Sequence, residues 1–280
     1  MVRKKSLIVF SITSDIGRFV AKKYQDKGYI IYGTYRKEES LNGLKVDFPE
    51  GHFYICDASN PDSIDHATSL IKKDIKSWDI LISCPCTPVP IAPFIDSDID
   101  EWEKSFYLNS PAQLRFMHKL IDVREKTSNG NHPLVLFFAG GGTNNAVHSF
   151  SAYTSAKIHL IKMFEFLSHE DETTKYTIIG PGWTNTKTHY ETLKYSDEKS
   201  KKHIEVKSFL NDPSHGTPLK DIYDCIEWVN NQSRDVVSGR NFSVVHDNWK
   251  GENSSFLIEA LKKDQDIYKL RRKGNDLVFE

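Results

Sequence analysis

The sequence lacks several features that would assign it to a specialised class of protein. Its formal net charge is only −1, so it has no electrostatic signature for nucleic acid or an anionic membrane. Four cysteines in 280 residues are too few to indicate a disulfide framework. No apolar run is long enough to cross a bilayer, and no small-residue cleavage site follows the short run near the start. We therefore expect a soluble cytoplasmic protein with a small-molecule partner, without nucleic acid, membrane or metal.

Short apolar runs alternate with amphipathic stretches along most of the chain. Strands are predicted at residues 6–12, 29–35, 52–56, 80–83, 134–138, 176–179 and 241–245. Helices are predicted between them, at about 15–28, 60–76, 98–125, 151–170 and 218–231. Strand–helix alternation at this spacing is typical of right-handed βαβ units around a parallel sheet. The predicted fold class is therefore α/β, a doubly wound parallel sheet in a single domain.

Two regions depart from this alternation. Residues 188–217 are polar and end in Asn211-Asp-Pro-Ser-His-Gly216, which indicates a substrate lid or an insertion. Residues 247–280 form a charged tail with a helix-like stretch at about 255–270. Neither contains a convincing linker, so we expect one domain over 1–246 and a tail, 247–280, that packs on it.

The first predicted strand runs into Ser11-Ile-Thr-Ser-Asp-Ile-Gly17 and then directly into a helix. Such a turn presents backbone N–H groups and the positive end of the helix to a pyrophosphate. Glycine usually serves in this turn because a Cβ obstructs close approach, and here only Gly17 remains. On these residues alone, an ordinary strand–helix turn explains the pattern equally well.

Further segments, in order along the chain, resemble the short-chain dehydrogenase/reductase family. The family's glycine-rich turn matches Phe10-Ser-Ile-Thr-Ser-Asp-Ile-Gly17, and its later motifs match Asp57, Leu108-Asn109, Tyr153-Thr-Ser-Ala-Lys157 and Pro181-Gly182. The resemblance covers roughly residues 5–246 and implies a Rossmann fold that binds a nicotinamide dinucleotide. It also implies a homodimer or homotetramer. By the same resemblance, the pyrophosphate site is framed by Ser11, Thr13, Ile16 and Gly17, the adenine is contacted by Asp57, and the nicotinamide lies beside Pro181 and Gly182.

The end of the second predicted strand bears on the choice of cofactor. A carboxylate at this position binds the ribose hydroxyls of NAD, whereas an arginine favours the 2′-phosphate of NADP. The chain reads Gly33-Thr-Tyr-Arg-Lys37, with no acid before Glu38. Arg36 therefore favours NADP(H) over NAD(H). The alternative is that Arg36 and Lys37 are solvated loop charges.

Tyr153 and Lys157 are four residues apart on a predicted helix, so they share one face. An ammonium beside a phenol favours phenolate, which predicts a lowered pKa for Tyr153 and suits it to acid–base work during hydride transfer. The resemblance implies that Lys157 also binds the nicotinamide ribose. It further implies that Asn109 holds a water in a proton relay.

Two positions depart from the family pattern. The catalytic serine, expected about thirteen residues before the tyrosine, falls within Phe137-Phe-Ala-Gly-Gly-Gly142, at Ala139 or Gly140. After the fourth strand, Ser83-Cys-Pro-Cys86 replaces the family's Asn-Asn-Ala-Gly, and we interpret its thiols as buried and inert. Either Thr143, His148 or the substrate supplies the missing donor to an active reductase, or the protein binds dinucleotide without turnover, as a sensor or partner subunit. The retained tyrosine, lysine and asparagine favour the enzyme.

The remaining residues bear on the substrate. His148 is predicted to line the cleft, and Trp183 either stacks on a flat substrate face, such as a sugar ring, or wedges the lid. Residues 238–249 and 266–272 resemble the tails of bacterial short-chain reductases in surface-polysaccharide pathways. We therefore expect an NADP-preferring oxidoreductase that interconverts a carbonyl and an alcohol on a small polar substrate. The tail resemblance favours a nucleotide-linked keto-sugar.

Overall fold

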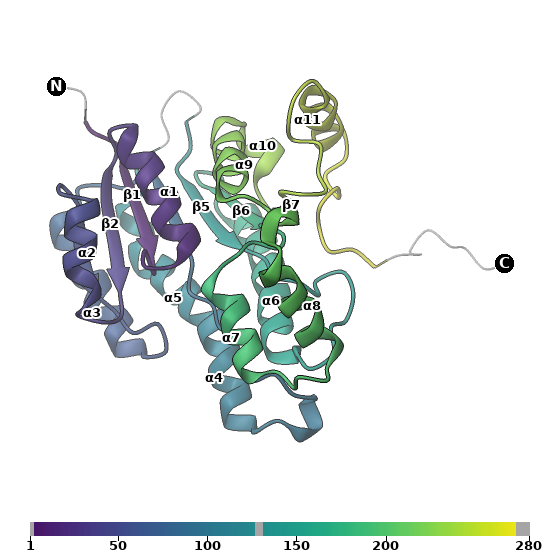
Figure 1. The fold of residues 1–280 in the computed structure, drawn as a ribbon. Coiled ribbons are helices and arrows are strands. Elements are labelled where there is room, and N and C mark those ends of the chain that lie inside the picture. Colours follow the sequence, from purple (N-terminus) through teal and green to yellow (C-terminus); the bar gives the residue numbers. More distant parts are fainter. Residues whose placement is uncertain (1–2, 127–130, 273–280) are drawn as a thin grey trace.

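A computed structural model describes residues 3–126 and 131–272. Its centre is a parallel sheet of seven strands in the order β3-β2-β1-β4-β5-β6-β7 (Figure 1). The strands are β1 (Ser6–Phe10), β2 (Ile30–Tyr35), β3 (His52–Ile55), β4 (Ile80–Ser83), β5 (Leu134–Phe138), β6 (Lys175–Gly180) and β7 (Arg240–Ser243). All seven predicted strands are confirmed, and so is the doubly wound α/β class. The strand order reverses between β1 and β4, which is where ligands bind in sheets of this kind.

Helices cover both faces of the sheet. One face carries α1 (Asp15–Asp26) and α9 (Leu219–Asn231), and the other carries α3 (Pro61–Asp74), α5 (Pro111–Leu120) and α6 (Ser151–Glu170). Because neighbouring strand residues point to opposite faces, Leu7 and Val9 belong to one core and Ile8 and Phe10 to the other. Burial on both faces explains why the central strands are continuous apolar runs rather than alternating ones.

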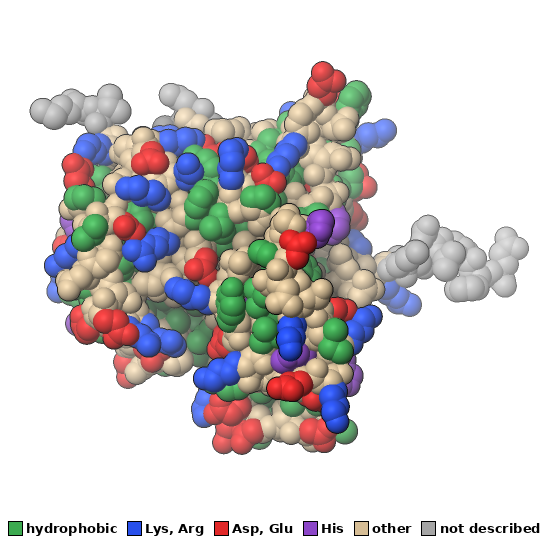
Figure 2. All heavy atoms as spheres, in the orientation of Figure 1, with side chains coloured by type: hydrophobic (Ala, Val, Ile, Leu, Met, Phe, Trp, Pro, Cys, Tyr) green, Lys and Arg blue, Asp and Glu red, His purple; other side chains and the backbone are tan. Residues whose placement is uncertain are grey.

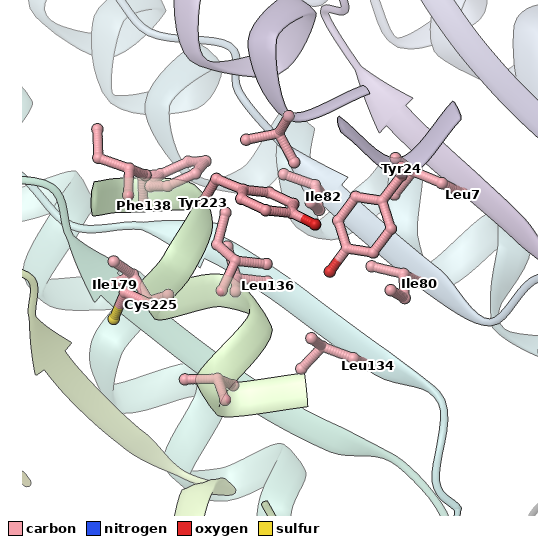
Figure 3. Close-up of a cluster of buried hydrophobic side chains, with 14 of the residues drawn as sticks. Leu7, Tyr24, Ile80, Ile82, Leu134, Leu136, Phe138, Ile179, Tyr223 and Cys225 are labelled. Carbon is pink, nitrogen blue, oxygen red and sulfur yellow. The ribbon is translucent and has the colours of Figure 1, made fainter. Parts of the chain in front are cut away.

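Two tyrosines join α1 and α9 across the first core. The rings of Tyr24 and Tyr223 meet edge to face, with centroids 5.7 Å apart. Figure 3 shows them above the strand side chains Ile80, Ile82 and Leu136. This packing holds α1, and with it the turn before α1, firmly on the sheet.

The predicted helix 98–125 is wrong as a single element. The structure has α4 (Ile99–Asn109), α5 (Pro111–Leu120) and a short 3₁₀ turn (Ile121–Val123). Pro111 lacks a backbone N–H and its ring clashes with the preceding turn of a helix, so the chain breaks at Ser110 and Pro111 starts the next helix. The proline was visible in the sequence and was the signal for this break.

Helices outside the main alternation differ most from the sequence prediction. The polar segment 188–217 contains α7 (Lys187–Tyr195) and α8 (Lys201–Asn211), while α2 (Ser40–Asp47) and α10 (Arg234–Val237) were not predicted. In the tail, α11 spans Asn253–Lys263, shorter than the expected 255–270. No helix in the described ranges is long and apolar enough to cross a membrane.

The described part of the tail is tied to the sheet edge by one arginine. Arg240 of β7 is 1% exposed, and its guanidinium donates hydrogen bonds to the backbone carbonyls of Leu261 (2.6 Å) and Ile267 (3.2 Å). These bonds compensate the desolvation of a buried charge. Residues 273–280 of the predicted tail lie outside the described residues.

Candidate active site

A cavity of about 1220 Å³ opens along the carboxyl ends of the parallel strands. The ends of all seven strands border it, through Ser11, Arg36, Cys56, Ser83, Ala139, Gly180 and Ser243. On the face of the molecule in Figure 2, acidic and basic side chains are intermixed. Because the ends of β1 and β4 border the cavity, it includes the point where the strand order reverses, as predicted for a dinucleotide site.

The turn after β1 has lost its first glycine but keeps the backbone shape that glycine favours. Ser11 adopts a left-handed conformation with φ 61°, and its N–H donates to the Thr34 hydroxyl (2.9 Å). Ser11, Thr13 and Ile16 line the cavity. Gly17 does not line it; a Cβ there would lie 2.6 Å from Ser14 Oγ, which caps α1 by accepting from the Gly17 N–H. Gly17 thus serves close packing at the helix start.

Asp15 takes the place of the second family glycine, and it joins the turn to the lid. Its carboxylate accepts a hydrogen bond from the backbone N–H of Lys187 (2.8 Å). The Lys187 ammonium in turn donates to the carbonyl oxygen of Thr13 (3.1 Å). A carboxylate is favoured at a helix N-terminus, which is also where a pyrophosphate would bind. No local sequence pattern indicates this contact, because 172 residues separate its two partners.

The predicted adenine end of the cavity contains both expected side chains. Arg36 is exposed and Asp57 is half-buried, and both line the cavity. One carboxylate oxygen of Asp57 accepts hydrogen bonds from the N–H (2.9 Å) and hydroxyl (2.7 Å) of Ser59. These bonds orient the Asp57 carboxylate. Arg36 is a basic side chain at the rim of the same cavity.

Tyr153 and Lys157 lie one turn apart on α6, and both line the cavity. Lys157 is 2% exposed, and its ammonium is 5.8 Å from the Tyr153 ring centroid. Burial and the adjacent Cys86 thiol raise the pKa of Tyr153 well above its ordinary value. Burial lowers the pKa of Lys157, although Cys86 and Cys84 oppose that effect. The predicted lowering of the tyrosine pKa is therefore wrong here, because desolvation disfavours the charged form of both groups.

Of the two positions where the resemblance places a catalytic serine, Gly140 is the one that faces Tyr153. A Cβ on Gly140 would lie 2.3 Å from the Tyr153 phenol oxygen, which identifies residue 140 rather than Ala139 as the one facing the tyrosine. Thr143 lines the same cavity. His148 is exposed, lies outside the cavity lining and hydrogen-bonds to its neighbour Ser149 (2.7 Å). The structure therefore does not bring His148 to the tyrosine.

The two cysteines after β4, which we predicted to be buried and inert, are only partly buried and lie at the cavity wall. Both Cys84 and Cys86 line the cavity, and both act on the pKa of Lys157. Burial raises the pKa of the Cys84 thiol to about 12. All four cysteines are free, and no cluster of three metal-ligating side chains occurs among residues 3–126 and 131–272. Both thiols are neighbours of Lys157, and Cys86 is also a neighbour of Tyr153.

Asn109 is fully buried at the end of α4 and does not line the cavity. Its side-chain amide donates to the Thr87 carbonyl (2.8 Å) and the Ser105 carbonyl (2.9 Å), and its oxygen accepts from the Thr87 N–H (3.1 Å). These bonds use both amide hydrogens. Asn109 is therefore a positioning residue for the loop that carries Cys86, and its part in a proton relay stays a prediction.

Pro181 and Gly182 line the cavity beside β6, and Trp183 follows them. The Trp183 ring packs against lid side chains, with centroids 5.2 Å from Phe209 and 5.4 Å from His189. These contacts support the lid-wedge interpretation, although Trp183 also lines the cavity and remains 37% exposed. Stacking on a substrate ring stays a prediction.

Comparison with known proteins agrees with this geometry. The family model described as enoyl-(acyl carrier protein) reductase matches residues 12–244. An uncharacterized oxidoreductase of Saccharomyces cerevisiae is 25% identical over 187 residues, 65% of this chain and 71% of the relative. A crystal structure of a short-chain dehydrogenase/reductase from the same yeast has a TM-score of 0.75 at 18% identity, covering 87% of this chain and 97% of that one. An Escherichia coli short-chain dehydrogenase in complex with NADPH has a TM-score of 0.71 at 16% identity, covering 87% and 98%.

Proposed function

Since the chain belongs to the short-chain dehydrogenase/reductase family, we propose that it is an NADP-preferring oxidoreductase that interconverts a carbonyl and an alcohol. The observation that carries this proposal is the pairing of Tyr153 and Lys157 on one face of α6, in the same cavity as the dinucleotide turn. A phenol and an ammonium at the carboxyl edge of the sheet suit proton exchange with a substrate oxygen.

The residues that line the cavity fit a dinucleotide along its length. Ser11, Thr13 and Ile16 would hold the pyrophosphate, Arg36 the 2′-phosphate, and Asp57 the adenine. The nicotinamide would lie beside Pro181 and Gly182, with Lys157 on its ribose, and would supply or accept the hydride when bound. Asp15 is the residue that fits least well, because its negative charge stands at the pyrophosphate end of the site.

In the reducing direction, Tyr153 gives its phenol proton to the carbonyl oxygen. The raised pKa keeps the phenol protonated at neutral pH but makes it a weaker acid, so proton transfer depends on stabilisation of the phenolate. Lys157 stabilises the phenolate that is left, since its ammonium is the nearest positive charge on the same helix face. Gly140 offers no hydroxyl to the substrate oxygen, so the second donor comes from Thr143 or the substrate; the loss of one such donor typically costs about 10²–10³ in rate.

The substrate that we propose is small and polar, with a nucleotide-linked keto-sugar of surface-polysaccharide biosynthesis as the specific candidate. Support comes from the polar side chains that the lid adds to the cavity, among them Thr184, Glu191 and Lys202. The resemblance of residues 238–249 to reductase tails in those pathways supports it further. We also propose a cytoplasmic homodimer or homotetramer, and light scattering would test its mass.

Two observations favour a second candidate, a non-catalytic dinucleotide-binding sensor or partner protein. Tyr153 fills the space where a serine would stand at residue 140, and Asp15 stands where a glycine would admit the pyrophosphate. One change lies in the turn with which the family binds its dinucleotide, and the other lies beside the tyrosine that exchanges the proton. A protein that binds dinucleotide without catalysing a reaction would tolerate both changes.

Titration with NADPH and NADH, followed by thermal stability and reduced-nicotinamide fluorescence, tests the proposal first. We expect NADPH to bind at least tenfold more tightly than NADH, and Arg36→Ala to remove that difference. Tyr153→Phe should abolish the reduction of ketones while leaving NADPH binding unchanged. Binding without turnover of any ketone or keto-sugar would favour the second candidate, and no binding of either dinucleotide by the folded protein would refute both.

A further inference from the structure

The segment from β6 to α7 places two residues with buried, unpartnered polar atoms at the cavity, next to Trp183. Thr184 is 4% exposed, and its hydroxyl has no hydrogen-bond partner. Nδ1 of His189, on α7, is also buried without a partner. Both residues line the cavity. Buried polar atoms are normally hydrogen-bonded, so two unpaired ones in residues of the cavity wall are candidates to bond a ligand.

An ammonium group lies over the neighbouring Trp183 ring, and its charge acts on His189. Lys202 of α8 lines the cavity, and its Nζ lies 4.1 Å from the Trp183 ring centroid, which holds the amine by a cation–π contact. Its carboxylate neighbour is Glu205, 3.7 Å away and half-exposed on the same helix. Burial lowers the pKa of Lys202 despite Glu205. The ammonium is therefore incompletely compensated and would gain from an anion in the cavity.

The nearby acid of α7 does not fill this role. Glu191 lines the cavity, but its carboxylate accepts a hydrogen bond from the Thr87 hydroxyl (3.3 Å), on the loop after β4. Arg36 and Lys194 are the charges that act on Glu191, and Lys202 is not among them. Glu191 and Lys202 therefore interact with different parts of the cavity wall.

The protonation state of His189 indicates which group of a ligand the imidazole would bind. Burial lowers the pKa of His189, and the charge of Lys202 lowers it further, so the imidazole is neutral near pH 7. A neutral imidazole has one nitrogen that accepts a hydrogen bond. The Thr184 backbone opposes this lowering of the pKa, and Nδ1 is buried without a hydrogen-bond partner. A substrate hydroxyl is the group that suits Nδ1.

We propose that Lys202, Thr184 and His189 form a substrate subsite for an anionic, hydroxylated ketone. Lys202 binds a phosphate or carboxylate, the Thr184 hydroxyl donates to it, and His189 Nδ1 accepts from a hydroxyl on the same molecule. Trp183 is the positioning residue that holds Lys202 over the subsite. The inference rests on the proposed function, because it takes the ketone to be the group reduced at Tyr153.

Matched substrates that differ only in charge test the subsite. Dihydroxyacetone phosphate is compared with dihydroxyacetone, and 4-oxopentanoate with its methyl ester, in NADPH-dependent reduction. We expect kcat/KM to favour one or both of the charged members by at least tenfold in the wild type. The two pairs distinguish a phosphate site from a carboxylate site. In Lys202→Gln the preference should fall to about twofold, with NADPH binding unchanged.

Lys201→Gln is the control, because Lys201 is the adjacent residue, contacts the same Glu205 at 3.8 Å and has a side chain that is 91% exposed. It should keep the full preference. Equal use of charged and neutral members by the wild type, or a preference that survives Lys202→Gln, would overturn the inference. Thermal stabilisation by the same four compounds without dinucleotide decides the question even if turnover is absent: Lys202-dependent stabilisation by a charged compound supports the subsite, and its absence refutes it.

Discussion

The phenol oxygen of Tyr153 lies 2.3 Å from the point that a Cβ of residue 140 would occupy. Two ring carbons of the tyrosine lie almost as near to that point, at 2.4 and 2.5 Å. The tyrosine therefore fills the space that a side chain at Gly140 needs. The absence of a side chain at residue 140 and the position of the tyrosine are a single structural feature, and adding a side chain at residue 140 displaces the tyrosine.

A methyl group at residue 140 should displace Tyr153. We expect Gly140→Ala to lower stability by about 1–3 kcal/mol, as overpacking does, and to lower kcat/KM more than tenfold. Gly141→Ala is the matched control, since a Cβ there meets nothing within 4 Å. In a double-mutant cycle measured by urea unfolding, Tyr153→Ala should relieve most of the cost of Gly140→Ala. Additive effects of the two changes would contradict the steric link.

Removing the Cys86 thiol should shift the pH profile. Burial is the main cause of the raised pKa of Tyr153, and Cys86 raises it further, so Cys86→Ala should lower that pKa. Alcohol oxidation needs the phenolate, so the rise of its rate with increasing pH should begin at a lower pH than in the wild type. Ketone reduction needs the protonated phenol, so the fall of its rate with increasing pH should also begin at a lower pH than in the wild type. Plots of kcat/KM against pH for oxidation and for reduction measure the two shifts. Cys225→Ala, which alters a buried thiol on α9, should leave both unchanged.

Neutralising Asp15 should affect stability and cofactor binding in opposite directions. The carboxylate sits in the first turn of α1, so Asp15→Asn should cost about 0.3–1 kcal/mol of stability. Removal of a negative charge from the pyrophosphate end should raise dinucleotide affinity by about two- to fivefold, the same free energy with the opposite sign. Thermal unfolding and fluorescence titration measure the two effects.

Asp26→Asn, at the other end of the same helix, is the control for Asp15. A negative charge at a helix C-terminus is unfavourable, so this variant should be unchanged or slightly stabilised, and its dinucleotide affinity should equal that of the wild type. Weaker dinucleotide binding by Asp15→Asn would mean that the contact with Lys187 supports the cofactor site instead of opposing it.

Glycine at residue 11 should stabilise the protein. A side chain in the left-handed region costs about 1–2 kcal/mol, and Ser11 has φ 61°. Because glycine also increases the entropy of the unfolded chain, we expect Ser11→Gly to add about 0.5–1 kcal/mol to the free energy of unfolding. Ser6→Gly, at the start of the same strand in extended backbone, should destabilise. A loss of stability in both variants would show that the Ser11 side chain outweighs its backbone strain.

Much of the fold could be predicted from the chain alone, because its determinants are local. Continuous apolar runs marked strands buried on both faces, and amphipathic spacing marked the helices between them. The four-residue spacing of Tyr153 and Lys157 placed both side chains on one helix face, in the cavity where the structure has them. Pro111 carried the signal for the break between α4 and α5, which the periodicity of the flanking residues obscured.

Only the tertiary structure decided which residues meet and in what environment. Whether Ala139 or Gly140 faces the tyrosine depends on how β5 and α6 are packed, and the contact of Asp15 with Lys187 joins residues far apart in the chain. The same holds for the sign of the Tyr153 pKa shift: four-residue spacing predicted a favourable charge pair, but burial of both groups outweighed it. Periodicity and turn sterics are properties of neighbouring residues, whereas desolvation and long-range contact exist only once the chain has folded.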